Sequence, residues 1–285
     1  MNNARWLSAY VDVAFFFFLA LAVAHPIVKA KQWTNLIMVF ILSVFMLADI
    51  LVQAQHLGLL ATGVASGNLM ALYSILLIIQ VLTGRVMPFF TRAVVPGTEI
   101  IDRPILEKIL LITLILLALA DILALNNILT AALAAVLLIA HLLRVSPWFS
   151  KPVLDIPILW VLYAGYLWFL IGFALKVMVG FGWVTNNLAI HAWTVGVIGI
   201  TTYGMMARVS LGHTGREMLP SKLAIIGFYL LFVAVIMRVI LPLFFVSLYT
   251  MWVDIAAILW CLAFILFAIA YIPVLTQPRV DGGEG

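Results

Sequence analysis

The sequence predicts an all-α fold, a polytopic transmembrane helical bundle of about nine spanning helices. Of the 285 residues, 66% are apolar and only 9% are charged, whereas roughly a quarter of the residues in soluble domains are charged. The apolar residues form runs of about 20, the length of helix that crosses a bilayer's hydrocarbon core. Backbone amides there must be hydrogen-bonded within a helix or a closed barrel, and these runs are far longer than barrel strands. We therefore expect the lipid bilayer to surround most of the chain.

Nine apolar runs define the expected spans, and connections rich in Pro and Gly separate them. Each boundary is uncertain by roughly three residues. No second domain, linker or low-complexity tract interrupts the pattern, so residues 1–285 are expected to form a single integral membrane domain. The spans cover residues 7–24, 34–52, 66–84, 105–124, 128–145, 156–179, 188–209, 222–241 and 251–272.

The basic residues alternate from one connection to the next. Lys and Arg collect on the cytoplasmic side of membrane proteins, and twelve of the 15 in this chain lie in the odd-numbered connections or near the C-terminus. This bias predicts an N-terminus outside, a cytoplasmic C-terminus and an odd number of spans. The twelve are Lys29, Lys31, Arg85, Arg92, Arg103, Lys108, Arg144, Lys151, Arg208, Arg216, Lys222 and Arg279, and the remaining three are Arg5, Lys176 and Arg238.

An alternative concerns the first span, where Ala22-Val23-Ala24 resembles a signal-peptidase site after an apolar stretch. Cleavage there would place Lys29 and Lys31 outside and would reverse the side of every later connection. The charge alternation therefore favours a retained helix.

Ionisable residues inside the membrane are functional candidates, because an unpaired charge there costs several kcal/mol, on the order of 3. Four carboxylates are expected within about two turns of the outer helix ends, and two cations lie at the same level. They form either a hydrated rim of ion pairs or an entry path for protons or cations. These residues are Asp12, Asp49, Asp121, Asp254, Lys176 and Arg238.

The cytoplasmic side offers a candidate anion site in Arg85, Arg208 and Arg216. Each lies in or near a segment that also contains Gly, and guanidinium groups bind carboxylates or phosphates through paired hydrogen bonds. A haem propionate, a nitrogen oxyanion or a lipid phosphate would suit such a site. The alternative is that these arginines only anchor the loops on the positive side.

The seventh expected span carries candidate metal ligands. At about 100° per residue, Thr194, Thr202 and Met205 lie on the same helix face as His191. Imidazole and thioether are ligands of haem iron and copper. His191 and Met205 are roughly 20 Å apart at 1.5 Å per residue, so they cannot bind one ion. The alternative is a hydrogen-bonded packing histidine.

His25, His141 and His213 are expected at cytoplasmic helix ends, where imidazoles from touching helices would form a metal site or would offset the helix dipoles. Cys261 is the only cysteine, so no disulfide forms within the chain. The sequence contains no nucleotide-binding Gly-Lys-Ser/Thr loop and no nucleic-acid module, and we expect no nucleic-acid partner.

Two longer segments and the apolar spacing from Tyr10 onward resemble the NnrS family of membrane proteins. The first segment is Gly84-Arg85-Val86-Met87-Pro88-Phe89-Phe90-Thr91. The second begins with His191-Ala192-Trp193-Thr194-Val195-Gly196 and ends with Met205-Met206-Ala207-Arg208-Val209-Ser210-Leu211-Gly212-His213-Thr214-Gly215-Arg216.

The resemblance implies a protein of nitric oxide metabolism and resistance in the inner membrane of denitrifying or NO-exposed bacteria, associated with haem and copper. Family members typically have about twelve helices, and this chain resembles the last nine. An upstream-helix partner or a homo-oligomer is therefore expected. The implied metal ligands are His141, His191 and His213, with Met205 or Met206 tuning the metal and Arg85, Arg208 and Arg216 holding propionates.

This chain departs from the family pattern at a few positions. Gln53 and Tyr163 occupy positions where members often have histidine, and Asp49 replaces the usual asparagine. These changes remove potential metal ligands.

Three functional hypotheses follow. The leading one is an NnrS-like haem- or copper-associated protein acting in the response to nitric oxide, including denitrification and nitrosative stress. The second is a transporter or permease without a redox metal. The third is a truncated member with a structural or partner-dependent role. The sequence assigns no catalytic residue, so enzymatic activity is left open.

The charge alternation makes a testable prediction about topology. Reporter fusions at Gly285 and in the loop of residues 58–67 are expected on opposite sides of the membrane, the former in the cytoplasm. Paired alkaline phosphatase and fluorescent-protein fusions measure this. Activity of one reporter type at both positions would contradict the topology.

Overall fold

The computed structural model describes residues 2–97, 101 and 103–283, and within these ranges it contains helices and no strands, as the sequence predicts. Among the described residues, eight helical segments are long and apolar enough to cross a membrane. The main helices are α1 (Asn2–Lys29), α2 (Leu36–His56), α3 (Val64–Val94), α4 (Pro104–Ile122), α5 (Asn127–Val145), α6 (Pro157–Gly180), α7 (Asn186–His191), α8 (Thr201–His213), α9 (Lys222–Val235), α10 (Leu241–Phe244) and α11 (Tyr249–Thr276).

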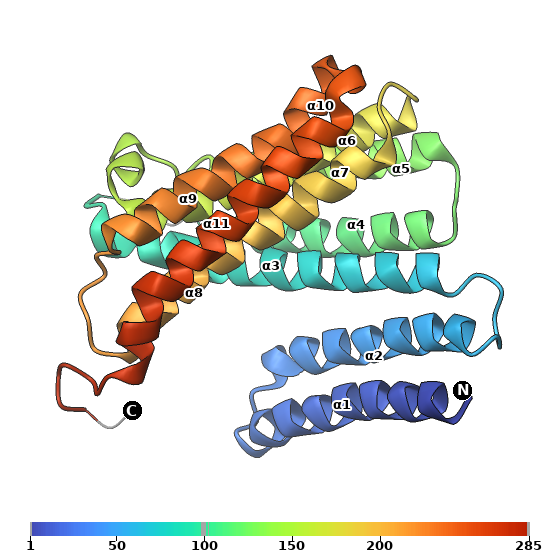
Figure 1. The fold of residues 1–285 in the computed structure, drawn as a ribbon, viewed down its shortest axis with the longest axis horizontal. Coiled ribbons are helices and arrows are strands. Elements are labelled where there is room, and N and C mark those ends of the chain that lie inside the picture. Colours follow the sequence, from blue (N-terminus) through green and yellow to red (C-terminus); the bar gives the residue numbers. More distant parts are fainter. Residues whose placement is uncertain (1, 98–100, 102, 284–285) are drawn as a thin grey trace.

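The expected span 105–124 is not among these eight; it corresponds to α4, which has 19 residues but carries Glu107, Lys108 and Asp121. It lies between α3 and α5 in the bundle (Figure 1). Two of its charged side chains form ion pairs with neighbouring helices, as described below. The charges of α4 therefore do not prevent it from packing as a bundle helix.

Two of the long segments contain a π-helical stretch. Residues Ala192–Ile200 join α7 to α8, and residues Ile236–Ile240 join α9 to α10. Because π-helical stretches are rare and occur frequently at functional sites, both segments are candidates for a functional region. The first also corrects the expected helix face, since the 100° spacing that grouped Thr194, Thr202 and Met205 with His191 holds only for an uninterrupted α-helix.

Helix ends follow from local residues. Pro104 and Pro157 begin α4 and α6, where the missing backbone N–H is not needed. The Asn126 side chain caps α5 by accepting from the Ile128 amide at 2.7 Å. The Ser221 hydroxyl caps α9 in the same way.

The connections alternate between two ends of the bundle, called the basic end and the opposite end. The basic end holds the α1–α2, α3–α4, α5–α6 and α8–α9 connections and the C-terminus, and the opposite end holds the N-terminus and the remaining connections (Figure 1). The residues expected on the cytoplasmic side thus lie together at the basic end.

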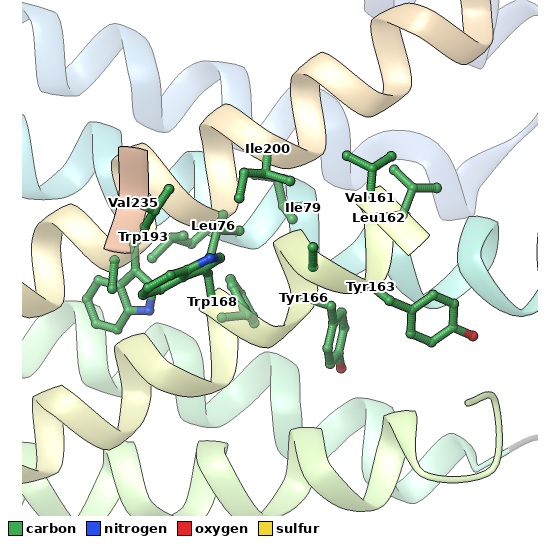
Figure 2. Packing of buried hydrophobic residues seen from close by; sticks show 14 of the residues in the cluster. Leu76, Ile79, Val161, Leu162, Tyr163, Tyr166, Trp168, Trp193, Ile200 and Val235 are labelled. Carbon is green, nitrogen blue, oxygen red and sulfur yellow. The ribbon is translucent and has the colours of Figure 1, made fainter. Parts of the chain in front are cut away.

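Helix α6 lies at the centre of the bundle and contacts α5 on one side and the α7–α8 segment on the other. At the second interface Trp168 of α6 and Trp193 (Figure 2) each lie against a glycine of the other helix, Gly196 and Gly172 respectively. A Cβ on Gly196 would lie 2.7 Å from Trp168, and a Cβ on Gly172 would overlap the indole of Trp193. Glycine at both positions therefore allows the two helix backbones to approach closely, as small residues do in membrane helix packing.

This packing predicts that Gly172→Ala and Gly196→Ala lower stability. Overpacking a filled core costs about 1–3 kcal/mol, which exceeds or cancels the gain of about 1 kcal/mol from replacing Gly in a helix. Gly212→Ala is the matched control, because a Cβ there meets only the flexible Met218 Cε at 3.0 Å. Thermal unfolding of the detergent-solubilised protein measures the difference. A control that unfolds as early as the two variants would contradict the close-approach explanation.

Candidate functional site

His141 on α5 is fully buried. Its Nε2 donates to Gln80 Oε1 of α3 at 3.1 Å, and its Nδ1 accepts from the Tyr166 hydroxyl of α6 at 2.7 Å. Phe173 stacks on the imidazole and Phe169 contacts it edge-on, with ring centroids 5.3 and 4.6 Å away. Both ring nitrogens therefore have partners, and aromatic rings enclose the imidazole.

Arg144 lies one turn beyond His141 on α5 and is also buried. Its guanidinium group forms a bidentate ion pair with Glu107 of α4, with Nε 2.6 Å from Oε1, and donates to the Gln80 carbonyl at 2.9 Å. A Cβ on Gly84 would overlap this guanidinium group. The glycine that begins the first motif segment is thus explained by the passage of Arg144 across α3.

A second polar cluster lies toward the opposite end. Lys176 of α6 is 2.6 Å from Asp121 of α4, and Asp121 also accepts from the Tyr73 hydroxyl at 2.6 Å. Lys176 donates to the side chain of Asn186, at the start of α7, at 2.9 Å. The Lys176 and Asp121 side chains are only 4% and 10% exposed. The pair is therefore part of the bundle interior and not of a hydrated rim.

Aromatic rings connect the two clusters. The Tyr73 ring contacts Trp193, Trp193 contacts Phe173, and Phe173 contacts Phe169, with successive centroid distances of 5.8, 5.3 and 5.0 Å. The last two rings also contact His141. We call the two hydrogen-bonded clusters, together with the buried aromatic rings that join them, the polar row. One cluster consists of Gln80, Glu107, His141, Arg144 and Tyr166, and the other consists of Tyr73, Asp121, Lys176 and Asn186.

The polar row can be reached from the basic end. A cavity of about 470 Å³ is lined by Arg85, Arg103, Arg144, Glu107 and Gln80, among others. It therefore combines three cations with one carboxylate and borders the side chain that contacts His141. A small polar or anionic solute in this cavity would lie next to the polar row.

The structure places Arg85 and Arg208 against different partners. Arg85 lines the cavity and donates to the Asn35 side chain at 3.3 Å. Arg208 lies over the Phe90 ring, with its guanidinium carbon 3.3 Å from the ring centroid. Phe90 belongs to the first motif segment and Arg208 to the second, so the two segments contact each other across α3 and α8.

Arg216 and His213 belong to the loop that holds the C-terminal segment. Arg216 donates to the Val274 carbonyl at 3.3 Å and to the Gln277 side chain at 3.1 Å. Arg279 donates in turn to the His213 carbonyl at 3.2 Å. The His213 side chain itself is exposed.

Gly215 allows this loop to turn beneath the C-terminal segment. Its φ is +69°, and a Cβ there would lie 2.5 Å from the carboxyl carbon of Asp281. Hydrogen bonds from Arg279 hold the pKa of the Asp281 carboxyl well below its usual range. The conformation of the second motif loop is therefore explained in part by contacts within the chain.

His191 lies at the opposite end from His141 and His213. Its Nδ1 donates to the Asn187 carbonyl at 2.6 Å, and its Nε2 accepts from Arg238 at 2.8 Å. The hydroxyls of Thr194 and Thr202 donate to backbone carbonyls of their own helix and not to His191. In the part of the chain that the structure describes, no three His, Cys, Asp or Glu side chains form a group that could hold a metal.

Met205 is partly buried and packs against the hydrophobic core, while Met206 is 38% exposed. The eight expected site residues are thus distributed among the polar row, the opposite end and the surface of the basic end.

The sequence analysis did not identify the partners of His141. Glu107 lies within the expected span 105–124 and was a detectable intramembrane carboxylate, but Gln80 and Tyr166 gave no signal of their own. Tyr163, at a position where a histidine was expected by resemblance, hydrogen-bonds to Thr91 at 2.8 Å and to the Trp148 carbonyl at 2.9 Å. Its hydroxyl therefore serves an interhelical network beside the polar row, and Figure 2 shows it on the same helix as Tyr166.

Comparison with known proteins gave one family match. The family model described as NnrS protein matches residues 1–279, nearly the whole chain. No significant match was found among curated proteins or among solved structures.

The two ion pairs of the polar row predict unequal effects of neutral substitution. Asp121→Asn leaves Lys176 buried without a counterion, which costs about 3–5 kcal/mol. Glu107→Gln is expected to cost less, about 1–3 kcal/mol, because the Glu107 side chain is 43% exposed and its carboxylate is therefore already screened by water, and because Arg144 keeps its hydrogen bond to the Gln80 carbonyl. Thermal unfolding in detergent ranks the variants, with Asp281→Asn at the exposed C-terminal pair as the control. A larger loss for Glu107→Gln would contradict this order.

Proposed function

Because the chain belongs to the NnrS family, whose model matches residues 1–279, we propose that this multi-pass membrane protein acts in the response to nitric oxide. The near-complete family match is the observation that carries the proposal. We place the protein in the bacterial inner membrane with its C-terminus in the cytoplasm, which the basic end supports through its Lys and Arg residues.

We propose the polar row as the working centre. Buried ionisable groups are costly in a membrane and are retained mainly where they carry function. The His141 cluster contains an imidazole, a phenol and an ion pair in one hydrogen-bonded set, and the cavity at the basic end borders it. Such a set can hold or pass a proton at His141 Nδ1 and can bind a small polar ligand at Arg144.

The described side chains do not fit a haem or copper site formed by one chain in this arrangement. His141 uses both ring nitrogens and is enclosed by Phe169 and Phe173. His191 has the tautomer that a metal needs at Nε2, but Arg238 occupies that position. His213 is exposed. The association with haem or copper that family membership implies is therefore proposed through His213 together with ligands from a second copy or another chain.

A second candidate function is transport without a redox metal. The observation that favours it is the cavity of about 470 Å³, which extends from Arg85 and Arg103 at the basic end to Arg144 in the interior. An optical spectrum of the purified protein separates the two functions, because a haem-binding protein shows a Soret band and a transporter without haem does not.

The proposal predicts that Tyr166→Phe impairs protection against nitric oxide. The change removes the hydroxyl that donates to His141 and is expected to cost only about 1 kcal/mol of stability. Tyr271→Phe is the matched control, because the Tyr271 hydroxyl is buried and has no hydrogen-bond partner among the described residues.

Growth of a deletion strain carrying each variant is measured with and without a nitric oxide donor, at equal amounts of membrane-inserted protein. The wild type and Tyr271→Phe should restore growth under the donor, and Tyr166→Phe should not. Full protection by Tyr166→Phe would remove the polar row from the proposal. No protection by the wild type would refute the role in the nitric oxide response.

A further inference from the structure

Arg238 is a partly buried cation at the opposite end of the bundle, in the π-helical stretch Ile236–Ile240. Its guanidinium group donates to the Tyr249 hydroxyl at 2.9 Å and to His191 Nε2 at 2.8 Å. Both partners are neutral, since His191 accepts at Nε2 from a guanidinium group, which can only donate, and donates from Nδ1 to a backbone carbonyl. Over the described ranges, the ion pairs involve Arg144, Lys176 and Arg279 and not Arg238.

This lack of a carboxylate partner distinguishes Arg238 from Arg144 and Lys176, the two cations that are buried among the described residues. Arg144 and Lys176 each have a counterion within the chain, as buried charges generally require. Asp254, a carboxylate of α11 at the same end, is exposed and does not line the space around Arg238. The guanidinium group has five N–H donors, and the two hydrogen bonds above leave donors for a further acceptor.

A cavity of about 510 Å³ adjoins the guanidinium group. Its polar lining comes from Arg238, Tyr249, Thr185 and Asn187, and its apolar walls include Trp183 and Leu188. Arg238 is the charged residue of this lining. The cavity therefore presents one positive charge, several neutral polar groups and an apolar wall.

Two partners from different elements hold the guanidinium group in place. His191 ends α7, and Tyr249 begins α11 and also lies under the guanidinium group, with its ring centroid 5.4 Å away. The π-helical stretches adjoin both His191 and Arg238. The arginine is thus oriented before any ligand binds, which reduces the entropy that binding must offset.

We infer that this cavity binds a phosphate-bearing anion at Arg238, either the headgroup of an anionic phospholipid or free phosphate. A guanidinium fork matches phosphate oxygens and forms paired, charge-assisted hydrogen bonds with them. Trp and Tyr side chains concentrate at the headgroup level of membranes, and Trp183 and Tyr249 both line this cavity. The polar groups beside Arg238 receive the phosphate, and the apolar wall accommodates the glycerol and upper acyl region of a lipid.

The test uses the full chain, purified in detergent and then in nanodiscs. In the first arm, inorganic phosphate is titrated and binding is followed by the shift in melting temperature. In the second arm, native mass spectrometry counts the phosphatidylglycerol molecules retained in competition with phosphatidylcholine. Arg238→Gln removes the charge, and Arg5→Gln at the same end is the control because Arg5 does not line the cavity.

Arg238→Gln is expected to weaken binding by about 10- to 100-fold, the range for lost hydrogen bonds to a charged group, whereas Arg5→Gln should bind like the wild type. An effect in the phosphate arm identifies free phosphate, and an effect confined to the lipid arm identifies the headgroup. Equal binding by the wild type and Arg238→Gln in both arms would overturn the inference.

Arg238→Lys provides a second variant if Arg238→Gln does not give helical, monodisperse protein. It retains the charge but loses the planar fork, so binding should weaken about tenfold. Unchanged binding in Arg238→Lys, in a preparation where Arg238→Gln cannot be folded, would also count against the site.

Discussion

The ion pair of Lys176 and Asp121 is the constraint from which the arrangement of the central helices follows. A charge in the hydrocarbon region has no water to solvate it, so each partner requires the other at the same depth. The pair fixes α6 against α4, and the hydrogen bonds of Tyr73 and Asn186 add α3 and the start of α7 at that level. Gln80 lies seven residues after Tyr73 on α3, which places it two turns, or about 10 Å, further along nearly the same face. At that level the Gln80 side chain accepts a hydrogen bond from His141, and the Gln80 carbonyl accepts one from Arg144.

Glycine determines how closely the remaining helices approach. Gly84 makes room for the Arg144 guanidinium group, and Gly172 and Gly196 make room for two indoles. The indole nitrogens of Trp168 and Trp193 are buried and have no hydrogen-bond partner among the described atoms. The two indoles therefore stabilise the interface through shape complementarity, and each unsatisfied N–H donor costs about 1–3 kcal/mol.

Much of the fold was predictable because hydropathy directly reports which segments leave water. The expected spans correspond to the helices, and the alternation of basic residues corresponds to the two ends of the bundle. The partners within the site were not predictable for a specific reason. Helix α6 is apolar around its whole circumference, so no sequence periodicity indicates which of its faces meets α5. Tyr166 consequently could not be assigned to His141 before the structure was known.

The contact between Lys176 and Asp121 could not be predicted for a related reason. Their positions along the helices were correct, but a position near a helix end does not say whether a side chain faces water or a neighbouring helix. Arg85 and Arg208 illustrate the same point: both lie at the basic end, but Arg85 contacts Asn35 and Arg208 contacts Phe90.

The π-helical stretch Ala192–Ile200 makes the number of residues between His191 and Arg208 as important as their identities. A π-helical turn holds one residue more than an α-helical turn, so if this stretch became α-helical with all its residues retained, α8 would rotate by about 100° about the helix axis relative to α7. Arg208 would then leave the Phe90 ring, while His191 would keep its place beside Arg238. A change of this stretch from π-helix to α-helix would thus uncouple the two ends of the molecule without altering a single contact residue.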